Sequence, residues 1–133
     1  MTTKSKVKLP DKQPAIRVAA RPKDTNAAGN IFGGWIMSQV DIAGSIAAVQ
    51  RAKGRVATVA VNSFEFHEPV FVGDLISCYT DIIRVGNTSI TVGVEVYAQR
   101  NPSNPETVRV TQAELTYVAL DENHRPRPVP KEQ

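Results

Sequence analysis

The sequence predicts an α+β fold in which one long buried helix is wrapped by an antiparallel β-sheet. Residues 34–51, GWIMSQVDIAGSIAAVQR, are mostly apolar over a length typical of a helix. Residues 89–98, SITVGVEVYA, alternate apolar with other side chains, as a strand with one core face does. Gly86-Asn87 precedes that strand and favours an antiparallel hairpin, because both residues tolerate positive φ.

The remaining segments supply one short strand before the helix and three longer strands after it. In chain order the expected elements are a strand at 15–20, the helix at 34–51, and strands at 55–66, 75–85, 89–98 and 107–120. Pro22 and Gly29 mark the loop before the helix, and residues 53–55 end the helix. We expect the last four strands to form an antiparallel meander and the helix to be buried on nearly all sides.

The charge of the chain is concentrated in its first part. The chain has 133 residues and a net charge of +3, which suits one domain with a real core. Residues 1–23 hold seven basic side chains and one acidic one. We therefore expect residues 1–14 to be a flexible basic leader and residues 15–130 to form a single domain. The leader has no aromatic platforms, so no nucleic-acid partner is expected.

The composition predicts a cytoplasmic protein without membrane insertion. Ser38, Gln39 and Asp41 interrupt the longest apolar run, and the N-terminus lacks the apolar core of a secretion signal. Cys78 is the single cysteine, so no disulfide forms within the chain. We expect it to be a buried structural thiol, compatible with a reducing compartment.

Asp41 is the main indication of function, because it places a carboxylate in the middle of an apolar helix. An unpaired buried charge is costly enough that a protein neutralises it, pairs it or uses it. Helical spacing puts Gly34, Ser38, Asp41 and Ser45 on one narrow, small and polar face. The residues leave two interpretations open. Asp41 either hydrogen-bonds Ser38, Ser45 or a neighbouring strand, or it takes part in catalysis.

Glycines lie directly before the predicted helix, in the segment NAAGNIFGG at residues 26–34. The first N–H groups of a helix have no partner within the helix, and they can stabilise an anion or a developing oxyanion. A Gly-Gly pair also suits tight packing against a sheet. The segment is therefore compatible with an oxyanion hole without requiring one.

Several segments together resemble the hotdog-fold acyl-CoA thioesterases of the bacterial YciA type. They are DTNAAGNIFGGWIMSQVDIAG, GRVATVAV, FHEPVFVGD, VGNTS and RPRPVP, and the resemblance covers roughly residues 15–130. It implies a hotdog fold that pairs into dimers, often three dimers to a hexamer, with active sites at the dimer interface. It also implies hydrolysis of acyl-CoA to free acid and coenzyme A. Coenzyme A is then part of substrate and product, and no separate cofactor or metal is expected.

The resemblance implies roles for individual residues. Asp41 is the catalytic carboxylate, acting as general base on water or as nucleophile, and Asn26 reaches the same site from the partner subunit. Backbone amides near Gly33 and Gly34 form the oxyanion hole. The residues implied in coenzyme A binding are Val59, Phe64, His67, Arg84, Gly86, Asn87, Thr88 and Ser89.

One position departs from the family pattern. Where relatives place Lys or Arg before the proline, this chain has Glu68. This substitution leaves Arg84, Arg125 or Arg127 to hold the phosphates of coenzyme A, although ordinary surface solvation also accounts for each of them. His67 beside Glu68 is not a metal pair, because neighbours on a strand point to opposite sides.

Other functions remain as alternatives. No Gly-x-Ser-x-Gly elbow occurs, and neither His67 nor His124 lies in a nucleophile setting. A hotdog dehydratase or hydratase commonly uses a helical histidine, which residues 34–51 lack. A non-catalytic acyl-CoA-binding module would make Asp41 structural. We expect self-association in each case, because a sheet around one helix leaves strand edges and an outer face uncovered.

Overall fold

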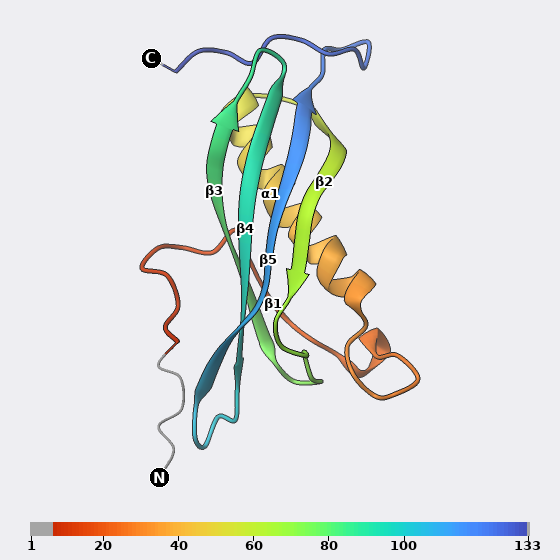
Figure 1. Cartoon of the computed structure of the whole chain (residues 1–133), viewed down its shortest axis with the longest axis vertical. Helices are drawn as coiled ribbons and strands as arrows, with labels where there is room; N and C mark the ends of the chain where they lie inside the picture. Colours follow the sequence, from red (N-terminus) through yellow and green to blue (C-terminus); the bar gives the residue numbers. More distant parts are fainter. Residues whose placement is uncertain (1–6, 133) are drawn as a thin grey trace.

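The computed structural model describes residues 7–132 and packs one helix against one antiparallel sheet (Figure 1). The elements are β1 (Ile16–Ala19), the 3-10 turn η1 (Pro22–Asp24), α1 (Gly33–Ala52), β2 (Val56–Phe66), β3 (Leu75–Val85), β4 (Ser89–Arg100) and β5 (Glu106–Ala119). The α+β prediction is confirmed, and the expected helix and strands are present with ends that differ by one or two residues. The loop after Pro22 additionally contains η1.

The strand order is β1-β3-β4-β5-β2, with every neighbouring pair antiparallel. The predicted meander is correct for β3, β4 and β5 and wrong for β2, which pairs with β5 along its length. Two features explain this. The short strand β1 occupies the outer edge of β3, where Ile16 lies opposite Cys78, and residues 67–74 form a connection too long for a tight hairpin.

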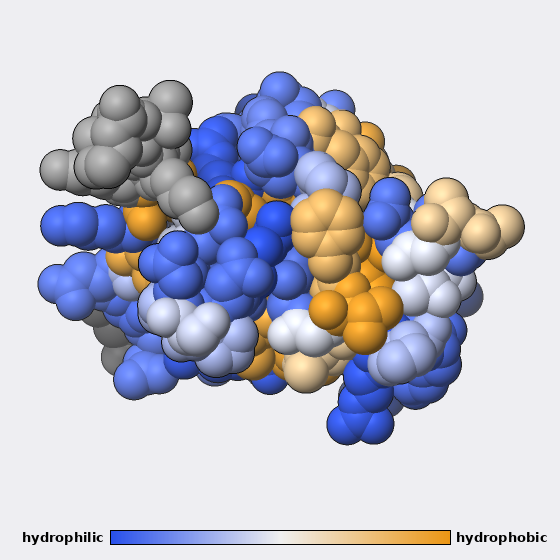
Figure 2. Space-filling view, turned by 90° about the horizontal axis from the view of Figure 1, so that it is seen from below, coloured by the Kyte–Doolittle hydropathy of each residue, from blue (hydrophilic) through white to orange (hydrophobic). Residues whose placement is uncertain are grey.

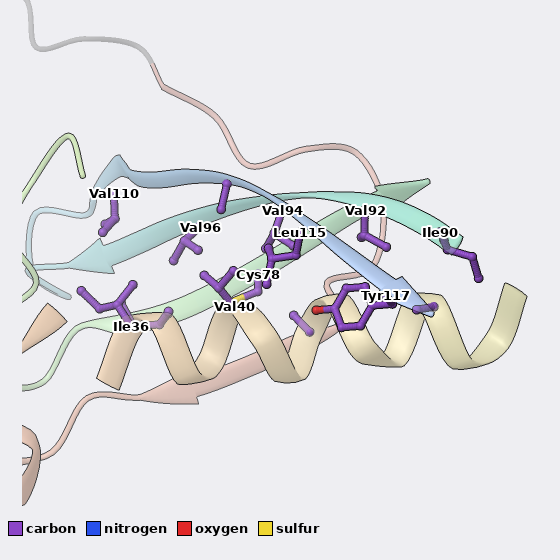
Figure 3. Packing of buried hydrophobic residues seen from close by; sticks show 14 of the residues in the cluster. Ile36, Val40, Cys78, Ile90, Val92, Val94, Val96, Val110, Leu115 and Tyr117 are labelled. Carbon is purple, nitrogen blue, oxygen red and sulfur yellow. The ribbon is translucent and has the colours of Figure 1, made fainter. Parts of the chain in front are cut away.

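One side of α1 forms the core with the sheet. Its buried residues are Ile36, Val40, Ala43, Gly44, Ala48 and Ala52. They face the apolar side of β3, β4 and β5, where Figure 3 shows Val92, Val94, Val96 and Leu115 directed towards the helix. The helix ends at Lys53, which has a left-handed φ of 56° and donates its N–H to the Val49 carbonyl.

The opposite side of α1 is not covered, so the prediction of a helix buried on nearly all sides is wrong for the single chain. Ile42 is 49% exposed, and the helix also exposes Met37, Ile46 and Val49. The neighbouring strand β2 exposes Val59, Val61 and Phe66. We call these seven residues the α1–β2 apolar face. Apolar content indicates that a helix needs cover, but it does not tell which chain supplies the cover.

The segments near the two ends of the chain contact different parts of this framework. Lys12 donates to the Asp81 carboxylate at 2.7 Å, which places this part of the predicted leader against β3. Residues 1–6 of the predicted leader lie outside the described residues. The C-terminal segment crosses the end of α1, where Arg127 donates to the Ala52 carbonyl at 2.9 Å. Between residues 7 and 132, none of the helices combines the length and apolarity that crossing a bilayer requires.

Candidate active site

Two hydroxyl groups from neighbouring strands hold the carboxylate of Asp41. Thr58 Oγ1 on β2 donates to Asp41 Oδ1 at 2.7 Å, and the Tyr117 hydroxyl on β5 lies 3.1 Å from the same oxygen. Thr58 and Tyr117 are opposite each other in the β2–β5 register, so both side chains point towards α1. The two strands therefore converge on one carboxylate oxygen.

The serines on the same helical face do not contact Asp41. Ser38 donates to the Trp35 carbonyl and Ser45 donates to the Ile42 carbonyl, each at 2.7 Å. Among the structural partners considered for Asp41, the neighbouring strand is correct and the two serines are not. The cause is that a serine in a helix readily bonds the carbonyl one turn back.

The second carboxylate oxygen of Asp41, Oδ2, accepts no hydrogen bond from residues 7–132. The Asp41 side chain is only partly buried, and its helical neighbour Ile42 belongs to the α1–β2 apolar face. The free oxygen thus belongs to a side chain at the border between the core and an uncovered apolar surface. A carboxylate in this position can accept a proton or attack a carbon atom.

Tyr117 keeps its proton in this environment. Its side chain is fully buried. Burial is the main cause that raises the pKa of Tyr117 well above its ordinary value, and the charge of Asp41 and the hydrogen bond to it add to the shift. The group is therefore protonated and able to donate a hydrogen bond at neutral pH.

Thr58 and Tyr117 were not predicted as site residues. Both lie in segments that the sequence correctly assigns to strands, but their meeting depends on the long-range pairing of β2 with β5. The predicted meander paired β2 elsewhere and concealed this contact. No local sequence signal identifies them, because the pairing of Thr58 with Tyr117 is a contact between distant segments.

The start of α1 presents the two amides that were predicted as an oxyanion hole. Phe32 precedes the helix without a side-chain cap, and the N–H groups of Gly33 and Gly34 find no acceptor within residues 7–132. A cavity of about 320 Å³ lies here, lined in part by Gly33, Phe66 and His67. A Cβ at residue 33 would lie 3.3 Å from the Phe66 ring, so tight packing also favours this glycine.

Figure 2 views this end of the molecule and shows apolar surface gathered among hydrophilic residues. Phe32 and Phe66 are large apolar side chains of this region, 40% and 51% exposed respectively. Figure 1 places the first turn of α1 and the end of β2 at the same end of the fold. The amides at the helix start therefore border a mainly apolar surface, where an electrostatic interaction is stronger than in water.

Asn26 lies in the loop before α1, and the oxygen and the nitrogen of its side-chain amide differ in their contacts. Its Oδ1 accepts the backbone N–H groups of Ala28 and Asn30 at 2.9 and 3.2 Å. Gly29 completes the turn with a φ of 87°. The Nδ2 group donates to no acceptor among residues 7–132, and no hydrogen bond links Asn26 to Asp41 within one chain. The free chemical function of Asn26 is therefore hydrogen-bond donation.

Within one folded chain, two groups of residues predicted to bind coenzyme A lie at opposite ends of the molecule. The β3–β4 turn, residues 86–89, lies at the end where α1 finishes, and His67 lies at the end where α1 starts (Figure 1). A 20-residue helix is about 30 Å long. The structure therefore does not bring His67 and the turn together within one chain.

The β3–β4 turn is fixed by the C-terminal segment. Val129 donates its N–H to the Asn87 carbonyl at 2.8 Å, and Ala119 donates to the Thr88 carbonyl at 2.9 Å. The Gly86 N–H bonds the Ser89 carbonyl at 2.8 Å and closes the turn. These contacts use main-chain groups, so the side chains of Asn87 and Thr88 remain available for a ligand.

Two other predicted residues lie on β2 and differ in exposure. Val59 is 57% exposed and is skipped in the pairing with β5, between Thr58 and Ala60. Phe64 is half-buried and stacks near Phe66, with ring centroids 4.9 Å apart. The irregularity at Val59 leaves its main chain outside the regular ladder, which suits contact with an amide-containing ligand.

The three arginines considered for the phosphates differ in their contacts. Arg84 on β3 makes no side-chain hydrogen bond within residues 7–132. Arg125 uses only main-chain groups: its N–H donates to the Asp121 carboxylate, and its carbonyl accepts the Asp121 N–H. Arg127 is committed to the main-chain carbonyls of Leu120 and Ala52. Arg127 is therefore a poor candidate for the phosphates. Among residues 7–132 no cluster of three or more metal-ligating side chains occurs.

Comparison with known proteins agrees with this architecture. A family model described as Thioesterase superfamily matches residues 28–103. The chain is 50% identical over 119 residues to an uncharacterized acyl-CoA thioester hydrolase of Haemophilus influenzae, covering 88% of this chain and 77% of that protein. It is 43% identical over 126 residues to the acyl-CoA thioester hydrolase YciA of Escherichia coli K12, covering 93% and 96% respectively.

A solved structure shows the same fold. The crystal structure of a hexameric hotdog fold thioesterase of Campylobacter jejuni superposes with a TM-score of 0.86 at 47% identity, covering 90% of this chain and 91% of that one. The resemblance predicted from the glycine-rich loop, the helical aspartate and the flanking segments is thereby confirmed. The chain belongs to the thioesterase superfamily, and it has the hotdog fold of the YciA-type acyl-CoA thioester hydrolases.

Proposed function

We propose that the protein hydrolyses acyl-CoA thioesters to a free acid and coenzyme A. The observation that carries the proposal is the state of Asp41, whose Oδ1 is held by Thr58 and Tyr117 while Oδ2 has no partner within residues 7–132. The two hydroxyls fix the direction of the carboxylate, and Oδ2 is left available to take a proton or to attack a carbon atom. The relatives described above support the substrate class, since they are acyl-CoA thioester hydrolases.

The free oxygen supports two routes to the same products. As a general base, Asp41 Oδ2 takes a proton from water while the water oxygen bonds to the thioester carbonyl carbon. As a nucleophile, Oδ2 itself bonds to that carbon and forms a mixed anhydride, which water then hydrolyses. In both routes the carbonyl oxygen becomes negative, the carbon–sulfur bond breaks, and the thiolate of coenzyme A leaves and takes a proton.

The amides of Gly33 and Gly34 and the side chain of Asn26 supply the remaining groups. The two amides have no acceptor among residues 7–132, so they can stabilise the negative carbonyl oxygen. Asn26 Nδ2 is a free donor that can orient the water or the carbonyl. Because Asn26 and Asp41 do not meet within one chain, we assign the Asn26 of a complete site to the partner subunit.

Self-association completes the proposed site. The α1–β2 apolar face requires cover, and β2 is an edge strand with a free side for pairing. We propose that two chains pair through this face and that three such dimers form a hexamer, the state of the Campylobacter jejuni relative. Pairing of this kind also allows His67 of one chain to share a site with the β3–β4 turn of the other.

We assign residues 15–130 to one catalytic domain and coenzyme A binding to the predicted set on β2, β3 and the β3–β4 turn. Arg84 has no side-chain partner within residues 7–132 and is our candidate for a phosphate contact. Coenzyme A serves only as part of substrate and product. We place the reaction in the cytoplasm, where a reduced buried thiol such as Cys78 is stable.

Asp41→Asn tests the proposal, because it keeps the shape and the hydrogen bonding of the side chain and removes its charge. A free-thiol assay on short, medium and long acyl-CoAs should show turnover by the wild type and a kcat lowered roughly 10² to 10⁴-fold in the variant. The melting temperature and the oligomeric state should hardly change. A destabilised variant with wild-type kcat would make Asp41 structural, and a wild type that binds acyl-CoA without turnover would make the protein a binding module.

A further inference from the structure

The hydroxyl of Tyr117 contacts Asp41, although packing of the core requires only the aromatic ring at this position. Tyr117 is fully buried among apolar side chains of the sheet, and its hydroxyl is directed towards α1 (Figure 3). That hydroxyl lies 3.0 Å from the Asp41 carbonyl oxygen and 3.1 Å from Asp41 Oδ1. Phenylalanine would fill the same space without the cost of burying a hydroxyl.

The helix is built to admit this hydroxyl. A Cβ at residue 44 would collide with the Tyr117 hydroxyl oxygen and would lie 3.1 Å from its Cζ. Glycine inside a helix lowers its stability relative to alanine. Gly44 therefore sits in the one turn of α1 that faces the tyrosine, and its presence is explained by the close approach of β5.

We propose that Tyr117 is a positioning residue for Asp41: its hydroxyl, admitted by Gly44, fixes Oδ1 so that Oδ2 is the oxygen presented to the thioester. The inference rests on the proposed function, because it assigns one reacting atom within that site. Thr58 donates to the same Oδ1 from β2. The single proton of the Tyr117 hydroxyl is shared between Oδ1 and the Asp41 carbonyl oxygen, which ties the carboxylate to its own main chain. Thr58 and Tyr117 together restrict rotation of the carboxylate, and Oδ2 stays free for the reaction.

The two donors differ in how firmly they are held. Thr58 lies on the exposed edge strand β2, next to the irregularity at Val59. Tyr117 lies on β5, an interior strand between β4 and β2, and its side chain is fully buried in the core. A rigid aromatic side chain has few rotamers to explore once its ring is packed. Tyr117 is therefore the more rigid of the two donors and determines the orientation of the Asp41 carboxylate. The position of Asp41 Oδ2 follows from the packing of α1 on β5.

Tyr117→Phe removes the hydroxyl and keeps the ring. We expect kcat to fall roughly ten- to a hundredfold, as for loss of a hydrogen bond to a charged group, while KM for acyl-CoA stays within about twofold. Tyr97→Phe is the matched control. It removes another buried tyrosine hydroxyl, one near the charge of Glu95 and without a hydrogen bond to Asp41, and it should keep wild-type kcat.

Repeating the Tyr117→Phe change in Asp41→Asn protein distinguishes a positioning role of Tyr117 from a purely structural one. In Asp41→Asn protein the residual turnover no longer depends on where a charged Oδ2 points, so adding Tyr117→Phe should change kcat little. A structural role would lower kcat by the same factor in both backgrounds. Equal kcat values for wild type and Tyr117→Phe, with an active wild type, would overturn this inference and leave the proposed function standing. An inactive wild type would instead overturn the proposed function.

Gly44→Ala tests the positioning role of Tyr117 by a change in α1. The added methyl group displaces the Tyr117 hydroxyl, so this variant should reproduce the lowered kcat of Tyr117→Phe. In the double variant the hydroxyl is absent, and the two effects on kcat should be far from additive. A Gly44→Ala protein with wild-type melting temperature and wild-type kcat would contradict the role assigned to the contact between Gly44 and Tyr117.

Discussion

At the scale of the residue, Asn26 shows how one side chain serves both structure and reaction. Its Oδ1 satisfies the N–H groups of Ala28 and Asn30 and so shapes the loop before α1. Its Nδ2 remains a free donor within the described residues. The oxygen is needed for folding of the loop in the single chain, and the nitrogen is needed only where substrate is present.

Asn26→Asp tests this division, since aspartate keeps the oxygen that accepts the two loop N–H groups and lacks the donor. We expect kcat to fall roughly tenfold or more while the melting temperature stays close to that of the wild type. Asn26→Ala removes both functions and should lower kcat and the melting temperature together. Steady-state kinetics and thermal unfolding measure the two effects, and wild-type kcat in Asn26→Asp would remove the Nδ2 group from the reaction.

Cys78 gives a prediction for the pH dependence of stability. Burial raises the pKa of the Cys78 thiol from 9.0 to about 12. Above pH 9 the unfolded chain releases this proton while the folded chain keeps it, so the unfolded state binds fewer protons and the free energy of unfolding falls as the pH rises towards 12.

Cys78→Val removes the titrating group and keeps a similar volume. Between about pH 8 and about pH 10.5 the wild type should lose about 2 kcal/mol more of its free energy of unfolding than the variant does. Urea unfolding of both proteins at the two pH values measures this difference. Parallel losses would mean that the thiol ionises as easily in the folded protein as in the unfolded chain.

At the scale of the element, the chain shows which structure can be predicted from local pattern. The helix and all five strands follow from periodicity and turn residues within about a dozen positions, and their bounds were predicted closely. The partner of β2 depends on contacts between distant segments, such as Val56 opposite Ala119 and Phe66 opposite Thr111. No local pattern contains that information, so the meander was wrong at this strand.

The candidate site divides in the same way. Asp41, Asn26, Gly33 and Gly34 belong to one continuous segment around the start of α1, and the sequence places them without any long-range contact. Thr58 and Tyr117 join Asp41 only through the pairing of β2 with β5, so they could not be found from the sequence. When the partner of a strand is predicted wrongly, the site residues that depend on that pairing are therefore not identified.

The end of α1 gives a prediction at this scale. Arg127 caps the helix by donating to the Ala52 carbonyl while it also bonds the Leu120 carbonyl, each at 2.9 Å. Arg127→Met should lower the free energy of unfolding by about 1–3 kcal/mol, because partly buried carbonyls lose a charged donor. Arg125→Met is the control, since the Arg125 side chain makes no hydrogen bond within residues 7–132 and its loss should have little effect.

Urea unfolding and acyl-CoA kinetics of the two arginine variants separate the roles considered for them. A stability loss in Arg127→Met with an unchanged KM confirms a helix-capping role. An unchanged free energy of unfolding together with a raised KM would assign Arg127 to the phosphates of coenzyme A instead.

At the scale of the whole molecule, the groups of the proposed site lie at opposite ends of the folded chain, and the α1–β2 apolar face is exposed to solvent. The α1–β2 apolar face includes Ile42 and Val59, and both border groups that we assign to the reaction. The same surface therefore drives pairing and forms the wall of the site. Binding of substrate and association of subunits are expected to support each other.

Mixing two inactive variants tests a site shared between chains. Asn26→Ala and Asp41→Ala are each expected to be nearly inactive alone. If Asn26 and Asp41 of one site come from different chains, random exchange gives half mixed dimers, each with one intact site, so activity should return to about a quarter of the wild-type value. Exchange proven by mass spectrometry without any recovery would place both residues in the site of one chain.

The collision that a Cβ at residue 44 would cause with Tyr117 also restricts how this protein can change during evolution. Helix propensity favours alanine over glycine inside α1, so mutation at residue 44 is a short route to a more stable helix. That route is closed as long as Tyr117 keeps its hydroxyl. The two positions are therefore expected to change together among descendants, and a lineage that exchanges Gly44 for a larger residue gives up the hydrogen bond that orients its carboxylate.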